Sequence, residues 1–290
     1  MRPRRYLQLD VFADRPGAGN PLGVVLDAAD MDAAQMQAFA AWLNLSETIF
    51  FLPPSDAGAD YHVRIFTPCR ELPFAGHPSV GAAWAAIETG IAPEGVELRQ
   101  QCAAGLLPVR VEGQGPARRI RLRAPRARPL PMPETCANLL ANLLAPWSRG
   151  AMAPALWDNG PHWWLVELAD DHAVRSLQPD LPAIAALTRA SSAVGLAVFG
   201  QTPAGSDHAL AVRAFCPADN IPEDPVTGSV NACIAAALHA QARLPAGDGY
   251  VASQGRELGR DGRVEIHVDE DGEVWIGGQV QAVIAGSATW

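Results

Sequence analysis

The sequence predicts an α+β protein made of two similar halves. The chain has 290 residues, which is more than a typical single domain holds, so two domains are expected. A motif at residues 64–78 returns at 213–229, which indicates that both halves share one structural plan. Proline-rich residues between the copies are typical of a connecting segment. The expected parts are an N-terminal half over 1–123, a connection over 124–133, a second half over 134–279, and a last strand, 280–290, that crosses back to the first half.

Composition and charge narrow the class of protein. Apolar residues make up 49% of the chain and charged residues 18%, which is enough for large cores. The net charge of −9 argues against a nucleic-acid partner, and we interpret the arginines between 118 and 128 as solvated surface. No run approaches 18 apolar residues, so no membrane span is predicted. Five cysteines without a CxxC pair, and no signal peptide, predict free thiols in a cytoplasmic protein.

The first half is predicted to be mostly strands with two helices. Asp32 and Gln35 form a capping-box pattern, and the apolar residues that follow repeat with helical spacing. The alanine-rich residues 79–87 predict a second helix that ends at Gly90. Alternating or apolar β-type runs predict strands at 6–13, 22–26, 48–52, 61–67, 96–100, 106–111 and 120–123.

The second half repeats this mixture. We interpret the eight tryptophans, most of which fall at strand positions, as core residues. Helices are predicted at 134–144, 181–189 and 229–239, and strands at 163–168, 193–199, 208–216, 250–253, 264–268, 274–276 and 280–285.

The two copies of the motif can be aligned residue by residue. The matched pairs are Arg64 with Arg213, Phe66 with Phe215, Pro68 with Pro217, Pro73 with Pro222 and, after three extra residues in the second copy, Gly76 with Gly228 and His77 with Ser229. The same register places Leu196 opposite Glu47. The strand is therefore duplicated and its acidic residue is not.

Each copy leads from a strand through a glycine-bounded loop into a helix. The first N–H groups of a helix have no internal partner, and a glycine lets a ligand approach them closely. Helix starts at Gly76 and Gly228 therefore predict binding of one small anion, most simply a carboxylate. Ordinary strand-to-helix corners would leave the same pattern, and that alternative stays open.

The polar residues beside these helix starts are Glu47, His77, Asp224 and Ser229. A carboxyl group in a closed apolar cleft can act as an acid/base near working pH, and helix N-termini can stabilise the negative charge of a deprotonated substrate. Glu47 could also be a solvated edge charge, and Asn20 either a turn residue or a ligand contact. The chain has no metal-binding spacing, GxGxxG, P-loop or GxSxG. These features predict an isomerase or epimerase without a cofactor.

Six blocks distributed along the chain resemble those of the phenazine-biosynthesis (PhzF-like) isomerase family. The resemblance implies the diaminopimelate-epimerase-like fold, with two pseudo-symmetric domains that each wrap a curved sheet or barrel around a central helix, an active site in the cleft between the domains, and a tendency to form homodimers. The blocks are Asp10-Val-Phe, Gly19-Asn-Pro-Leu, Leu45-Ser-Glu-Thr, Phe66-Thr-Pro, Glu71-Leu-Pro-Phe-Ala-Gly-His-Pro and Glu223-Asp-Pro-Val-Thr-Gly-Ser, with Gln254-Gly and Gly277-Gly similar as well.

The resemblance also implies roles for individual residues. Glu47 is the acid/base that moves a proton between carbons of the substrate, and His77, Asp224 and Ser229 surround it. The amides next to Gly76 and Gly228 receive a carboxylate. Related racemases have two cysteines where this chain has His77 and Ser229, which disfavours a two-thiol racemase. Gly17 stands where a bulky Phe is expected, which leaves the substrate open.

Three functions compete at this point. The leading one is a cofactor-independent isomerase of a small carboxylate. The second is an amino-acid epimerase or racemase on the same fold, with Glu47 and either Asp224 or His77 as opposing bases. The third is a binding protein that keeps the carboxylate site without catalysis. Retention or inversion at the reacting carbon separates the first two.

Overall fold

The structure, a computed structural model, describes residues 2–290 and divides the chain into two compact units. Unit 1 comprises Met1–Arg123 and Gly277–Trp290, and unit 2 comprises Ala124–Ile276. This division differs from the expected one at two places. Residues 124–133, expected as a connection, lie in unit 2 and contain β9 (Arg128–Leu130), and residues 277–279 lie in unit 1.

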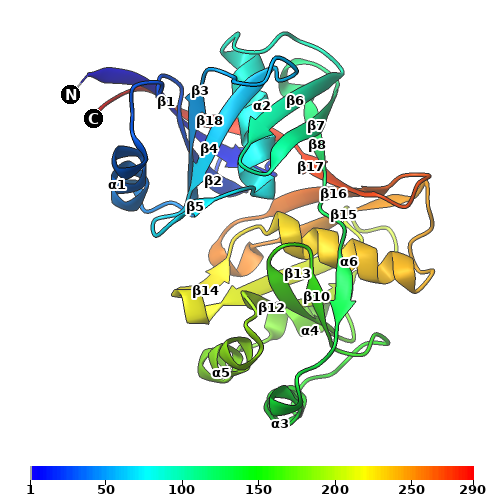
Figure 1. Ribbon diagram of the computed structural model, residues 1–290. Helices are drawn as coiled ribbons and strands as arrows, with labels where there is room; N and C mark the ends of the chain where they lie inside the picture. The colour runs from blue at the N-terminus through cyan, green and yellow to red at the C-terminus, as the bar shows by residue number, and fades with distance from the viewer. Residues whose placement is uncertain (1) are drawn as a thin grey trace. The chain divides into compact units, whose positions relative to one another are not determined.

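Unit 1 is a curved sheet around the helix α2 (Gly76–Glu88), drawn in cyan in Figure 1. Ten of the 13 residues of α2 are buried, and the helix contacts strands on several sides. This explains its alanine- and glycine-rich sequence, since a Cβ on Gly81 would lie 2.4 Å from Leu22 Cδ2. The other elements are β1 (Pro3–Val11), β2 (Asn20–Val25), α1 (Ala33–Leu43), β3 (Glu47–Leu52), β4 (Tyr61–Phe66), β5 (Glu71–Leu72), β6 (Glu97–Cys102), β7 (Gly105–Glu112), η1 (Gly115–Ala117), β8 (Arg119–Arg123) and β18 (Val280–Thr289).

Unit 2 repeats this plan around α6 (Gly228–Ala240), which also has 13 residues and a mostly buried surface. Three further helices, α3 (Ala137–Leu144), α4 (Asp171–Ser176) and α5 (Leu181–Ser191), belong to this unit. Its remaining elements are η2 (Glu134–Cys136), β10 (Ala155–Asp158), β11 (His162–Glu167), β12 (Gly195–Gln201), β13 (Leu210–Cys216), η3 (Pro217–Asp219), β14 (Ile221–Asp224), β15 (Gly249–Gln254), η4 (Arg256–Leu258), β16 (Gly262–Val268) and β17 (Val274–Gly278), whose last two residues belong to unit 1.

Strand pairing shows that the two units are structural repeats. In unit 1, β1–β2 is antiparallel, β2–β3 parallel, β3–β4 antiparallel, β4–β6 parallel and β6–β7 antiparallel. In unit 2 the same alternation runs through β10–β11, β11–β12, β12–β13, β13–β15 and β15–β16. The prediction of two similar halves, each with a curved sheet and a central helix, is confirmed.

The last strand of the chain closes unit 1. β18 pairs antiparallel with β1, from Pro3 opposite Thr289 to Val11 opposite Val280. The two ends of the chain therefore lie side by side in this unit (Figure 1). The capping box predicted for α1 is present, because Asp32 Oδ1 accepts from the Gln35 backbone N–H and Gln35 Oε1 accepts from the Asp32 N–H.

The structure corrects the alignment of the repeats at two positions. Leu72 pairs with Ile65 in unit 1, and Asp224 pairs with Ala214 in unit 2, so the three extra residues enter before Glu223. Pro73 therefore matches Pro225, and not Pro222. The wrong match arose because Pro222 lies as far along the chain from its strand as Pro73 lies from its own. The strand pairing instead places the inserted residues before Glu223.

The second correction concerns the partner of Glu47. Phe50 pairs with Arg64 in β3–β4, whereas Val198 pairs with Arg213 in β12–β13. The register of the strands therefore places Gly195, one residue before Leu196, opposite Glu47. The connection between the two strands is one residue longer in the second copy, which sequence alignment without gaps could not detect.

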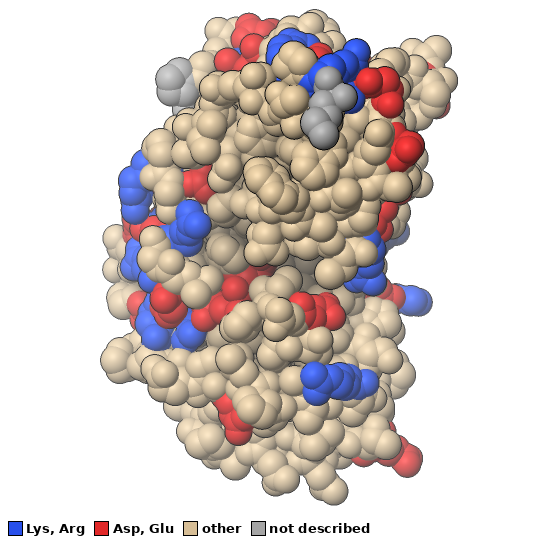
Figure 2. Space-filling view, turned by 90° about the vertical axis from the view of Figure 1, so that its left-hand side faces the viewer, with Lys and Arg blue, Asp and Glu red and all other residues tan. Residues whose placement is uncertain are grey.

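Charged side chains lie mostly in small groups of opposite sign, which Figure 2 shows as blue and red atoms next to one another. One interpretation from the sequence is wrong: Arg118 is not solvated but 4% exposed, and it pairs with Glu88 and Glu94. Trp42 is likewise no core residue, being 70% exposed. No helix in the described part of the chain is long and apolar enough to cross a membrane.

Candidate active site

Glu47 begins strand β3 at the head of the central helix of unit 1. The parallel ladder places it beside Leu22 of β2, and its side chain is 17% exposed. Its Oε2 lies 3.4 Å from Nδ1 of His77, the second residue of α2. The β3 strand and the start of α2 thus bring the predicted acid and the predicted histidine together.

His77 is held in its neutral form. Its side chain is 7% exposed, and burial lowers the pKa of His77 to about 3, although the nearby Pro21 carbonyl favours the protonated form. The contact with Glu47 is therefore one between a carboxyl group and a neutral imidazole at neutral pH, rather than an ion pair. A neutral imidazole can donate one hydrogen bond and accept another, which suits it to position a proton.

Asn20 lies beside the same group of residues. It begins strand β2 and is 1% exposed, and Ser46 Oγ donates to its Oδ1 over 3.3 Å. Because Ser46 directly precedes Glu47, this bond ties the two strand starts to each other. The structure therefore gives Asn20 a buried polar contact at the candidate site rather than only a turn.

Asp10 holds the loop before Asn20. In the sequence it was noted only as part of the Asp10-Val-Phe block. Asp10 is 2% exposed, and its Oδ2 accepts from the backbone N–H of Gly17 over 2.5 Å. Gly17 has φ of +87°, and a Cβ added there would meet nothing within 4 Å. A larger residue at this position would be strained by the backbone and not by its neighbours.

In unit 2 a hydrogen-bond network holds the loop that carries Asp224. Thr227 Oγ1 donates to Asp224 Oδ2 over 2.5 Å, and the buried Gln254 bonds both residues. Thr227 immediately precedes α6, as Ala75 precedes α2. Within the described residues neither side chain caps its helix, so the first-turn N–H groups at Gly76 and Gly228 receive no hydrogen bond from the side chain of the preceding residue.

Ser229, the match of His77, has a different environment. Its hydroxyl accepts a hydrogen bond from Trp163 Nε1 over 3.1 Å, and its backbone carbonyl accepts one from Asn159 Nδ2 over 2.9 Å. Both donors are nearly fully buried. Since the indole donates, the hydroxyl proton of Ser229 is left to point to another acceptor.

The structure thus brings together Asn20, Glu47, Gly76 and His77 in unit 1, and Asp224, Gly228 and Ser229 in unit 2. The sequence missed the roles of Trp163, Thr227 and Gln254. Trp163 was interpreted as core, and its polar N–H gave no pattern of its own. Thr227 and Gln254 stand in recognised blocks, but only the fold brings them into contact.

Two solved structures share this architecture. A phenazine biosynthesis protein of the PhzF family from Bacillus anthracis aligns with a TM-score of 0.84 over 100% of both chains at 23% identity. A hydroxyproline epimerase from Agrobacterium vitis aligns with a TM-score of 0.66 over 99% of this chain and 92% of that one at 14% identity. The fold is therefore that of the diaminopimelate-epimerase-like class.

Sequence comparison then identifies the family. A family described as phenazine biosynthesis-like protein matches residues 9–287, and the chain belongs to it. One relative, antisense-enhancing sequence 1 of Schizosaccharomyces pombe, is 32% identical over 99% of both chains. Another, the trans-2,3-dihydro-3-hydroxyanthranilate isomerase of Pseudomonas aeruginosa, is 33% identical over 93% of this chain and 92% of its own length. The resemblance seen in the sequence is confirmed.

Proposed function

We propose that this protein is a cofactor-independent isomerase that moves a proton between two carbons of a small carboxylate, with Glu47 as the acid/base. The observation that carries the proposal is the pair of Glu47 Oε2 and His77 Nδ1, 3.4 Å apart at the uncapped start of α2. Relatives named as isomerases support it. The alternative of a solvated edge charge fits poorly with a carboxylate whose side chain is 17% exposed.

The proposed step conserves atoms and electrons. The Glu47 carboxylate takes a proton from a carbon of the substrate, and the electron pair of that bond spreads into the adjoining unsaturated system. The protonated Glu47 then returns the proton to another carbon of the same molecule. The neutral His77 keeps the carboxyl group oriented, and the N–H groups at the start of α2 hold the substrate carboxylate and its growing charge.

The family resemblance assigns three residues of unit 2 to the same reaction. We include Asp224 as a second acid/base, and Ser229 with the N–H groups next to Gly228 as donors to the substrate. Asn20 is proposed as a further substrate contact from unit 1. Each of these assignments is a prediction for substitution experiments.

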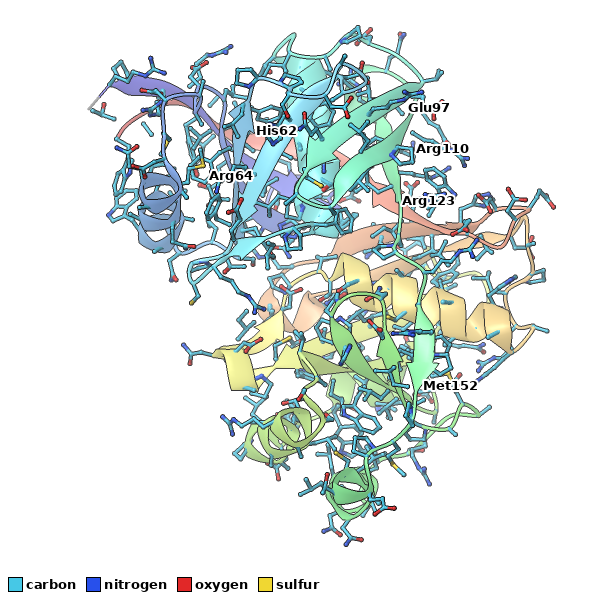
Figure 3. All side chains as sticks on the ribbon, in the orientation of Figure 1. His62, Arg64, Glu97, Arg110, Arg123 and Met152 are labelled. Carbon is cyan, nitrogen blue, oxygen red and sulfur yellow. The ribbon has the colours of Figure 1, made fainter. Side chains whose placement is uncertain are left out.

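The test compares the native protein with Glu47→Gln. We would incubate both in D₂O with trans-2,3-dihydro-3-hydroxyanthranilate and with a set of cyclic and amino carboxylates, and follow new isomers and deuterium by NMR and mass spectrometry. We expect a new isomer from the native protein and a loss of about 10²- to 10⁴-fold in rate for Glu47→Gln. Glu97→Gln is the control, because Glu97 is an exposed residue of β6 opposite Arg110 (Figure 3).

The outcomes separate the competing functions. Activity that survives in Glu47→Gln would show that another residue is the acid/base. Inversion at one carbon without migration of a double bond would identify an epimerase or racemase. Ligand binding to the native protein with no exchange and no isomer would identify a binding protein. The homodimer implied by the resemblance is tested by light scattering, which would give twice the 30.7 kDa chain mass.

A further inference from the structure

The amide of Gln254 uses all of its hydrogen-bonding capacity on the loop before α6. Its Nε2 donates to the Asp224 carbonyl oxygen over 3.0 Å and to Thr227 Oγ1 over 2.9 Å. Its Oε1 accepts from the Thr227 backbone N–H over 3.0 Å and from Asn231 Nδ2 over 3.1 Å. A backbone N–H can only donate, so the amide cannot be turned around without losing these bonds.

This fixed amide sets the direction of the next hydrogen bond. The Thr227 hydroxyl has one proton, and its oxygen already accepts from Gln254 Nε2. Its proton is therefore given to Asp224 Oδ2, which lies 2.5 Å away. With Asp224 ionised, Oδ2 is the acceptor of this hydrogen bond.

In the described part of unit 1, the matching positions lack the side chains that form this chain of bonds. The residue that matches Thr227 is Ala75, and the residue that matches Asp224 is Leu72. The helix α2 nevertheless starts in the same way as α6. The loop and the helix start therefore form without a threonine at this position. The threonine is present in the unit that has the acid.

We propose that Thr227 and Gln254 are positioning residues that hold the Asp224 carboxylate through Oδ2 and favour its ionised form. The inference rests on the proposed function, in which Asp224 is a catalytic residue. The relay Gln254→Thr227→Asp224 holds the carboxyl plane in place and supplies one donor to its ionised form.

The test follows the titration of Asp224 directly. The protein is labelled with ¹³C in its aspartate side chains, and the Asp224 signal is assigned by its loss in Asp224→Asn. In Thr227→Val the ionised carboxylate loses a hydrogen-bond donor, so we expect its titration midpoint to rise by roughly one pH unit. Thr227→Ser keeps the hydroxyl and should titrate as the native protein does. The control is Thr202→Val, which removes another hydroxyl of unit 2, bonded to the His208 carbonyl oxygen.

Two results would overturn the relay. One is an Asp224 titration midpoint in Thr227→Val that equals the native value. The other is an equal rise of this midpoint in Thr227→Ser, which would show that the hydroxyl is not the cause. The acidic limb of the pH–rate profile should move with the midpoint in Thr227→Val. The NMR titration needs no turnover, so it tests the relay independently of the proposed function. A native Asp224 midpoint in Thr227→Val would refute the relay even if Glu47→Gln is inactive. Activity in Glu47→Gln would refute the proposed base, and the Asp224 titration could still be measured.

Discussion

The starts of α2 and α6 occupy matching places in the two units and carry different chemistry. In unit 1 the strand beside the helix opens with Glu47, which faces His77. In unit 2 the match of Glu47 is Gly195, where an added Cβ would lie 2.4 Å from Cζ3 of Trp163. The indole thus fills the space of the missing acid, and its N–H bonds Ser229, the match of His77. One backbone plan supports an acid with an imidazole in one unit and a neutral pair of donors in the other.

The features that stayed the same belong to the scaffold. Arg64 of β4, labelled in Figure 3, makes two hydrogen bonds to Glu71, and Arg213 makes two to Glu223. Each guanidinium also lies over the phenylalanine two residues later, at 5.2 Å and 5.0 Å from the ring centre. The repeat therefore preserves the residues that shape the loop and the glycine that starts each helix, and it varies the polar side chains beside them.

The largest expected effect on stability comes from the Arg–Glu ion pair that both units share, because the pair is more buried in unit 2. The Arg213 and Glu223 side chains are 6% and 9% exposed, and Arg213 also donates to the Val174 and Leu177 carbonyl oxygens. Removing one partner of a buried pair costs about 3–5 kcal/mol, so Arg213→Ala should lower the free energy of unfolding by about that amount.

The matched variant Arg64→Ala should cost about 1 kcal/mol or less, since Arg64 and Glu71 are 26% and 34% exposed. Urea unfolding of both variants measures the difference. Equal losses would mean that burial does not distinguish the two copies of the pair.

The second prediction concerns His77, whose matching residue in unit 2 is Ser229. In the unfolded chain a histidine takes up its proton near pH 6.5, whereas the pKa of His77 in the folded protein is about 3. Between these values the unfolded state binds more protons, so stability should fall as the pH drops through this window, by at most about 1.4 kcal/mol per pH unit. Denaturant unfolding at pH 7, 6 and 5 should show a shallower fall for His77→Asn. An identical pH dependence in the two proteins would contradict a buried neutral His77.

The smallest expected effect tests the indole that replaces the acid. Trp163→Phe removes the donor to Ser229 Oγ and should lower stability by about 1 kcal/mol beyond the loss of ring size. Trp157 is the matched control on the paired strand, because its buried Nε1 has no acceptor in the described part of the chain. Under the proposed function, Trp163→Phe should raise KM more than it lowers kcat, since Ser229 would contact the substrate. If Trp163→Phe and Trp157→Phe behave alike, the indole N–H does not position Ser229.

The repeated plan, the two helix starts and the family could be predicted from the sequence alone. These features are local or periodic: alternating strands, a capping box at Asp32, glycines before alanine-rich helices, and short blocks that carry a resemblance. Glu47, His77, Asp224 and Ser229 could be selected as candidates because charged or polar residues beside a helix start are visible without a fold.

The contacts of these residues, in contrast, depend on the folded chain. The strand ladders moved the match of Glu47 to Gly195 and the match of Pro73 to Pro225, because insertions are resolved by backbone pairing and not by residue identity. The neutral state of His77 follows from burial among strands that are distant in the sequence. The bond from Gln254 to Thr227 joins residues 27 positions apart, so no local pattern could have predicted the orientation of Asp224.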